Sequence, residues 1–383
     1  MDIVLISPVA FGQPHDGHQQ AVLSDVYALL DNGLRVGFVG FTYEGKAPGS
    51  MGLSPSLLLH ARRGSFAVRF ARGIFGGYPP SAERLYGSEA HLAVREFLNK
   101  TRPRIVIIDD VSVSGYIPLV RDLLPASKVI LRSHNVMQDV RRVHLNRSHG
   151  PLKAAIKLDC NRYIEMEKKA VDGADDHWAI TLSDAARMTE LYGRPTRYLP
   201  VSIDIERYRS VSLDSGRVNG FVHIGTIDYR RQADFSRFLD VSWPKVLQAD
   251  PGSTLLLAGQ VPAALMPRTN VRCLGRVRDD AEVYAAGRFA VNFQKSTGGV
   301  KLKTLTSLAA GRVLLSTPEG VEGLPLTSGE HYWDMESTLV NGHLKTIMND
   351  PDGARAISLA GRQYVEQNHS RASIASQVRH LLN

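Results

Sequence analysis

The sequence has few of the residues that mark redox or zinc proteins. Only two of its 383 residues are cysteines, Cys160 and Cys273, and they lie too far apart along the chain to form a metal-ligand spacing. The 13 histidines form no HxxxH or HExxH pattern. We therefore expect two buried thiols in a reducing cytosol, no disulfide, and neither redox nor zinc chemistry.

Long apolar runs are also missing. No stretch of about 18 or more apolar residues is present that could span a bilayer, and residues 1–12 lack the basic lead-in of a signal peptide. We therefore expect a cytoplasmic protein.

What the chain does have is length, apolar content and positive charge. Its 383 residues, 43% of them hydrophobic, are enough for two domains. The formal net charge is +8, which favours partners that carry phosphate, such as a nucleotide, an anionic lipid surface or a nucleic acid. Basic residues are spread through both halves without an aromatic stacking motif, so we do not expect nucleic-acid binding.

Short apolar runs alternate with helical patterns in the first half. Residues 3–7, 36–41, 104–109 and 128–131 predict strands, and residues 22–30 predict a helix between the first two. This alternation is typical of a doubly wound parallel sheet, in which ligands bind at the carboxyl ends of the strands. His134 lies just past one such strand, at a ligand-facing position, although a lone histidine is more often structural.

The loop after the first strand contains Asp16 and Gly17, which suit either the rim of a crevice or a plain surface turn. Residues 57–78 mix arginines with bulky apolar residues. Such a segment suits an element that lies on an anionic membrane, and solvated arginines on an ordinary strand and helix give the same pattern. The arginines concerned are Arg62, Arg63, Arg69 and Arg72.

The second half repeats the strand and helix alternation. Residues 198–208 contain a proline and a change of polarity, which predict an interdomain hinge. Four further apolar runs, each leading into a glycine-containing loop, predict a second doubly wound sheet. We expect domains at residues 1–200 and 201–368, and a terminal helix at 369–383 that packs back on the first domain.

We expect the chemistry in residues 296–317. Gly298 and Gly299 let backbone approach a ligand closely, and a helix that starts near Val300 would direct its free N–H groups at that loop, as in anion sites. Lys303 lies in the first turn, at the ligand edge of the sheet. An ordinary amphipathic helix with solvated lysines would show the same local pattern.

Several pieces of sequence, taken in order, resemble the GT-B glycosyltransferases, in particular glycosyltransferase family 4. They are LRSHNV at 131–136, ADDHWAITLSDA at 174–185, LPVSIDIERY at 199–208, HIGTIDYRRQADFSRFL at 223–239 and GGVKLKTLTSLAAGRVLLSTPEGVEGL at 298–324. The resemblance implies two Rossmann-like domains that face each other across a cleft. The second would bind a nucleotide-diphosphate sugar and the first an acceptor, with no obligatory metal and no cofactor.

The resemblance also implies roles for single residues. Arg230 or Arg231, with Lys303, would neutralise the diphosphate, because negative charge builds on the leaving oxygen as the glycosidic bond breaks. His134 would lie beside the reacting sugar. The implied donor site consists of Gly225, Arg230, Arg231, Gly275, Arg276, Gly298, Gly299, Val300, Lys301, Lys303 and Thr306.

The chain departs from the family at two positions. Gly298 and Thr306 stand where the family usually has glutamates, the second of which holds the ribose. A charged acceptor forms hydrogen bonds about twice as strong as a neutral one, so Thr306 would hold a ribose less firmly. Relatives without these glutamates include inverting enzymes, which need a carboxylate base, and Asp16 and Asp139 are the candidates for it.

We therefore predict a hexosyltransferase-type glycosyltransferase that moves a sugar from a nucleotide-diphosphate sugar to a glycan or lipid-linked acceptor. The pathway expected is cell-envelope or exopolysaccharide biosynthesis, at the inner face of the cell membrane, with Gly17 and the four arginines on the acceptor or membrane side. Two alternatives remain open: a catalytically altered GT-B scaffold that only binds, and a nucleotide-sugar epimerase.

Overall fold

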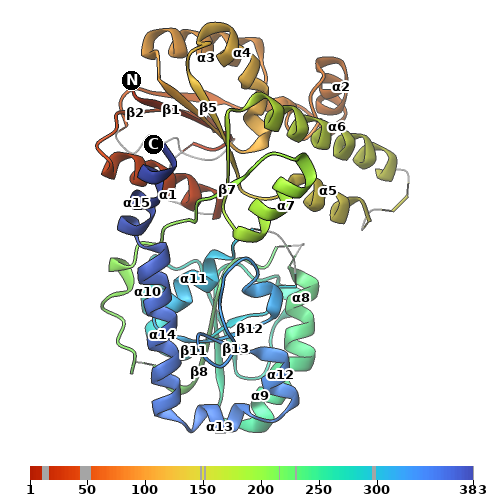
Figure 1. The fold of residues 1–383 in the computed structure, drawn as a ribbon. Coiled ribbons are helices and arrows are strands. Elements are labelled where there is room, and N and C mark those ends of the chain that lie inside the picture. Colours follow the sequence, from red (N-terminus) through yellow and green to blue (C-terminus); the bar gives the residue numbers. More distant parts are fainter. Residues whose placement is uncertain are drawn as a thin grey trace. The chain divides into compact units, whose positions relative to one another are not determined.

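The structure, a computed structural model, describes residues 1–10, 17–43, 53–146, 149–150, 152–214, 216–228, 231–295 and 299–382. The chain divides into two compact units (Figure 1). The first consists of Met1–Val201 and Ile374–Asn383, and the second of Ser202–Ser373. Their junction lies inside the stretch 198–208 where we expected the hinge.

The first unit is built on a seven-stranded parallel sheet with the strand order β3-β2-β1-β4-β5-β6-β7. Its strands are β1 (Ile3–Ser7), β2 (Val36–Thr42), β3 (Ser56–His60), β4 (Ile105–Asp109), β5 (Lys128–Ser133), β6 (Asp176–Ala179) and β7 (Arg197–Tyr198). The helices in order are α1 (Gly17–Asp31), α2 (Phe66–Gly76), α3 (Ser88–Thr101), α4 (Ile117–Leu123), α5 (Met137–Asn146), α6 (Leu152–Gly173), α7 (Leu182–Tyr192) and the end of α15 (Arg371–Leu382).

Helices cover both faces of this sheet, which explains why its central strands are apolar throughout. Every residue of β1 is buried, and alternate side chains enter opposite cores. Val4 and Ile6 pack with residues of α3, α4, α6 and α7, whereas Ile3 and Leu5 pack with residues of α1 and α15.

The second unit holds a six-stranded parallel sheet with the order β10-β9-β8-β11-β12-β13. Its strands are β8 (Arg217–Ile224), β9 (Thr254–Ala258), β10 (Val271–Gly275), β11 (Gly287–Asn292), β12 (Val313–Ser316) and β13 (Trp333–Asp334). The α-helices are α8 (Gln232–Arg237), α9 (Trp243–Ala249), α10 (Asp280–Ala286), α11 (Leu302–Ala309), α12 (Met335–Val340), α13 (Leu344–Met348) and α14 (Pro351–His369).

The predicted fold class, α/β with two doubly wound Rossmann-like sheets, is confirmed. The prediction for the thiols is wrong in one respect, because Cys160 is buried but Cys273 is exposed on the peripheral strand β10; both are free. In the part of the chain that the structure describes, no helix is long and apolar enough to cross a membrane.

Candidate functional site

In the second unit, the loop after β8 approaches the first turn of α11. Gly225 follows β8 with a φ of +148°, which side chains rarely tolerate. A Cβ atom at this position would lie 3.2 Å from Lys303 Nζ and 3.6 Å from His223 Nε2. The absence of a side chain at Gly225 therefore leaves room for these two nitrogen atoms beside the backbone.

The surroundings of Lys303 disfavour its positive charge. It is partly buried and lines a small cavity with Tyr284 and Ser307. Burial lowers the pKa of Lys303 to about 7, and repulsion from Arg231 and Lys301 contributes to the shift. Arg231 is partly neutralised by Asp228, 3.3 Å away. A bound anion would relieve the repulsion among the three cations, so the site is electrostatically prepared for one.

The backbone that leads into α11 is compatible with an anion site. Gly299 adopts a φ of +63°, and its carbonyl oxygen accepts a hydrogen bond of 3.2 Å from Lys301 Nζ. Val300 packs against the core, and Lys301 precedes the first helical residue. The helix therefore begins two residues after the predicted start near Val300, and its first turn places Lys303 at the carboxyl ends of the strands.

The remaining donor-site candidates differ in their exposure and in their hydrogen bonds. The Thr306 hydroxyl lies 2.8 Å from the Tyr284 hydroxyl and 3.2 Å from the Lys303 carbonyl, so it is engaged within the unit. Gly275 ends β10 with a φ of +67°, and Arg276 after it is exposed. Arg230 and Gly298 lie outside the described residues.

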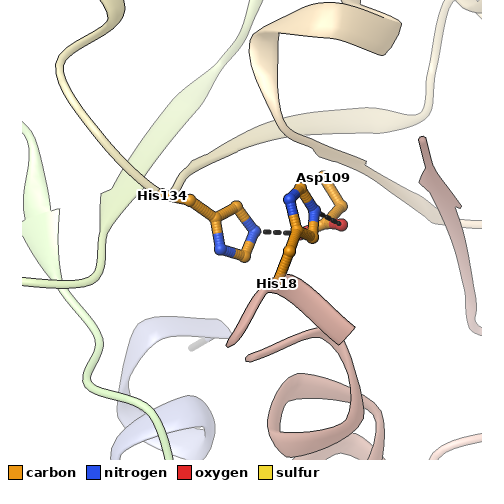
Figure 2. Close-up of side chains that lie close together, drawn as sticks. All are labelled: His18, Asp109 and His134. Atoms are coloured by element: carbon orange, nitrogen blue, oxygen red, sulfur yellow. Dashed lines mark hydrogen bonds and ion pairs between the residues drawn. The ribbon is translucent and has the colours of Figure 1, made fainter. Parts of the chain in front are cut away.

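In the first unit, the structure brings three side chains together at the carboxyl ends of neighbouring strands (Figure 2). Asp109 ends β4, His134 follows β5, and His18 lies in the first turn of α1. Asp109 Oδ1 is 2.6 Å from His134 Nε2, and Asp109 Oδ2 is 3.3 Å from His18 Nε2. The two imidazole rings stack with their centroids 4.2 Å apart.

The shared carboxylate fixes which nitrogen of each ring carries a hydrogen. Burial alone would raise the pKa of Asp109, but the charges and hydrogen bonds of His134 and His18 outweigh it and hold the pKa well below its usual range. A carboxylate only accepts hydrogen bonds, so each ring keeps its hydrogen on Nε2 and, when neutral, its lone pair on Nδ1. The side chain of His18 is 27% exposed and that of His134 only 6%, so His18 is the ring nearer to solvent.

A buried ion pair next to this cluster joins α1 to β5. Arg132 on β5 donates from Nε to Asp25 Oδ2 of α1 at 2.7 Å, and both side chains are buried. The pair fixes α1, which carries His18, against the strand that leads to His134. Breaking such a pair leaves an unpaired buried charge, which costs about 3–5 kcal/mol.

The three side chains of this cluster could also hold an ion. Within the described ranges, His18, Asp109 and His134 form a group whose ligand atoms all lie within 4.8 Å of one another. Two imidazoles and one carboxylate are ligands that Zn²⁺ accepts in proteins. The same atoms are satisfied by the hydrogen bonds between them, and the expectation of a metal-free reaction stays a prediction.

The structure places Asp139, one of the two base candidates, elsewhere. Its carboxylate is paired with Arg187 Nε of α7 at 3.0 Å, and its side chain is 42% exposed. Asp16 lies outside the described residues, and Gly17 is the exposed first residue of α1. The carboxylate beside His134 is instead Asp109, which the sequence had placed only as the end of a buried strand.

The arginines of residues 57–78 are partly engaged inside the first unit. Arg72 Nε lies 3.4 Å from the buried carboxylate of Glu83, and Arg62 donates to the Tyr86 carbonyl at 3.2 Å. Arg63 accepts at its carbonyl from Arg72. Burial raises the pKa of Glu83, and the charges of the nearby arginines, Arg69 among them, offset only part of that rise. On α2, by contrast, large apolar side chains are exposed: Phe66, Val68 and Phe75.

Comparison with protein-family models and with curated proteins found no match. Solved structures do match over the whole chain. Anabaena HepE in complex with UDP has 12% identity and a TM-score of 0.69, with 100% of this chain and 99% of that chain covered. Sucrose-phosphate synthase from Thermosynechococcus elongatus has 16% identity and a TM-score of 0.69, with 100% and 98% covered.

A variant of TarM from S. aureus, in complex with UDP and other ligands, has 9% identity and a TM-score of 0.68, and both chains are covered in full. At these identities the similarity concerns the fold. The chain has the GT-B fold of these proteins, which is the class that the two doubly wound sheets define.

Proposed function

We propose that this protein is a nucleotide-sugar-dependent glycosyltransferase whose second unit holds the donor diphosphate. The observation that carries the proposal is the position of Lys303, a partly buried cation at the first turn of α11, beside Gly225 at the end of β8. The GT-B proteins of similar fold include one solved with UDP-glucose, HepE, which supports a donor of this chemical class.

The negative charge that develops on the leaving group explains why cationic residues would be needed at the donor site. As the glycosidic bond breaks, its electron pair passes to the oxygen of the diphosphate, which departs with additional negative charge. Lys303, Arg231 and the N–H groups at the start of α11 are fixed before the reaction, so they stabilise this charge without reorganisation. Binding of the diphosphate also raises the fraction of Lys303 that is protonated.

The histidine cluster of the first unit would serve the acceptor. An acceptor hydroxyl must lose its proton as its oxygen attacks the anomeric carbon, and a histidine ring can take that proton at Nδ1. Asp109 fixes the ring and stabilises the imidazolium that forms. His18, the more exposed ring, is the better placed of the two, with His134 on the same carboxylate. Such a base supports a single displacement, which inverts the anomeric centre.

We further propose a glycan or lipid-linked acceptor, in cell-envelope or exopolysaccharide synthesis. The support is α2, where Phe66 and Phe75 are exposed on a helix that also carries arginines. A helix with exposed aromatics and nearby cations suits the surface of an anionic membrane. The enzyme would then meet its acceptor at that surface.

A nucleotide screen tests the donor site. We expect UDP, GDP, ADP, dTDP or CMP to raise the thermal midpoint of the protein, and calorimetry to give a 1:1 complex with the preferred nucleotide. Lys303→Ala should abolish the shift, whereas Lys345→Ala, which removes an exposed lysine of the same unit, should keep it. If none of these nucleotides binds the wild-type protein, the proposal is wrong.

A further inference from the structure

His223 is a buried histidine at the carboxyl edge of the second sheet. It lies on β8, two residues before Gly225, and is 2% exposed. Its Nδ1 atom is 2.7 Å from the carbonyl oxygen of Val291 on β11. Since a carbonyl oxygen can only accept, Nδ1 carries the hydrogen, and the neutral ring has its lone pair on Nε2.

The Nε2 atom of His223 is unsatisfied. It is buried and has no hydrogen-bond partner among the residues that the structure describes. The ring is held in place by Phe293, whose centroid lies 4.4 Å away. Buried polar atoms are paired in the great majority of cases, and each exception calls for an explanation such as a ligand that is not present.

Nε2 of His223 and Nζ of Lys303 face the same space above Gly225. A Cβ atom at Gly225 would lie 3.6 Å from the first and 3.2 Å from the second. The charged groups that act on the histidine are Lys303 from α11 and Arg231 from the start of α8, both cations. Asp228, 3.3 Å from Arg231, is an acidic group beside these cations.

These surroundings keep His223 neutral in the free protein. Burial, followed by the charge of Lys303 and then that of Arg231, holds the pKa of His223 well below its usual value. A neutral ring with its lone pair on Nε2 would repel a phosphate oxygen. A protonated ring would donate a hydrogen bond to it, and negative charge nearby favours that protonated form.

We propose that His223 is a phosphate-contacting residue of the donor site and takes up a proton from solvent when a nucleoside diphosphate binds above Gly225. The inference rests on the proposed function, because it concerns the same diphosphate. No covalent bond forms between the protein and the nucleotide: a proton from solvent adds to the lone pair of Nε2, and the resulting N–H donates a hydrogen bond to a phosphate oxygen. Nucleotide affinity should therefore rise as the pH falls below neutrality.

Calorimetry in buffers of different ionisation enthalpy measures this proton. At about pH 6, roughly nine-tenths of Lys303 is already protonated, because its pKa is about 7, so uptake there reports mainly on His223. The terminal phosphate of UDP titrates with a pKa of about 6 as well, but it contributes equally to every variant. The comparison between variants isolates the protein's share.

His223→Asn is the informative variant, since its amide can still donate to the Val291 carbonyl while Nε2 is removed. On binding UDP near pH 6, the wild-type protein should take up more protons than this variant, by at most about one proton per UDP bound. UDP affinity of the variant should be lower by about tenfold near pH 6, and the difference should shrink toward pH 8. His177→Asn, which replaces another buried histidine of low pKa in the first unit, should behave as wild type.

The outcomes separate the two proposals. Binding of UDP with equal proton uptake in wild type and His223→Asn overturns the role of His223 and leaves the donor site intact. No nucleotide binding by wild-type protein overturns both. Should the variant fail to fold, the NMR shift of the carbon-bound ring protons of wild-type His223 decides: movement to the protonated position on adding UDP supports the inference, and an unchanged shift overturns it.

Discussion

Asp109 and His134 form a hydrogen bond of 2.6 Å between a fully buried carboxylate and a nearly buried imidazole. Burying an ionised carboxylate is unfavourable unless it is paired, and here two rings pair with it, since His18 reaches its second oxygen. Replacing such buried polar groups by apolar ones is often neutral or stabilising. A chemical role is therefore a better explanation of the cluster than stability.

Asp109→Asn should lower kcat by about 10²–10⁴-fold, since the amide cannot stabilise an imidazolium and disturbs the ring tautomers. The Kd for nucleotide should not change, because the proposed donor site lies in the second unit. Steady-state kinetics with a donor and acceptor pair, together with calorimetry, would measure both constants.

Asp122→Asn is the control, since it removes an exposed carboxylate of the same unit that pairs with Arg95 at 3.5 Å. Full activity in Asp109→Asn would contradict the assignment. If Asp139→Asn were the inactive variant instead, the role of the base would return to Asp139.

The central strands could be predicted from the sequence to within one or two residues at most boundaries. Runs such as residues 3–7 are rich in Ile and Val because both faces of a parallel strand are covered. The peripheral strand β13 was missed, because its two residues give no apolar run. A strand in the region of β3 was one of the two open interpretations of residues 57–78, and its partial burial explains why the pattern did not decide between them.

The two sites differ in how far the sequence could predict them. Lys303 could be singled out as a candidate because the glycine loop, the helix start and the lysine lie in one segment. His18 and Asp109 were missed as a pair because they are 91 residues apart, and Asp109 is 25 residues from His134. They meet because β4 lies between β1 and β5, and local periodicity does not state the strand order.

Gly225→Ala should weaken nucleotide binding by at least about tenfold, because the new Cβ would lie 3.2 Å from Lys303 Nζ and fill the space above the backbone. The left-handed φ adds a loss of folding free energy of about 1 kcal/mol. Gly342→Ala is matched to it, since Gly342 has a φ of +70° but no atom within 4 Å of the Cβ position. We expect similar losses of stability by denaturation and a loss of binding in Gly225→Ala alone.

Lys303→Met should remove nucleotide binding while leaving the free protein at least as stable as wild type near neutral pH. The folded pKa of Lys303, about 7, lies below the ordinary value of 10.5, so the unfolded chain binds more protons between these values. Stability of wild type should then rise with pH across that window, and the rise should be smaller in the variant. Urea denaturation at pH 7 and pH 9 would measure it, with Lys345→Met as the control; a large loss of stability at pH 7 would contradict the expectation.

The exposed aromatics of α2 predict membrane association. Phe75 is 90% exposed and Phe66 55%. Fully burying one such side chain contributes about 1.5–3 kcal/mol, so the double variant Phe66→Ser, Phe75→Ser should bind anionic vesicles at least about tenfold more weakly. Sedimentation with vesicles that contain phosphatidylserine, at low and high salt, would measure the partition.

Neutralising all four arginines of residues 57–78 is a less clean test, because Arg72 compensates the buried carboxylate of Glu83, and Arg72→Gln would disturb the fold.

Arg62→Gln with Arg63→Gln is the better charge variant, since both side chains are exposed. It should reduce binding at low salt and make little difference at high salt, because salt screens the attraction between the arginines and anionic headgroups. Val340→Ser removes a 70% exposed apolar residue of the second unit and should bind as wild type does. Equal binding to neutral and anionic vesicles would contradict a role of anionic headgroups. If neither the aromatic nor the arginine variant changed vesicle binding, the membrane would drop out of the proposed function and a free glycan would remain as the acceptor.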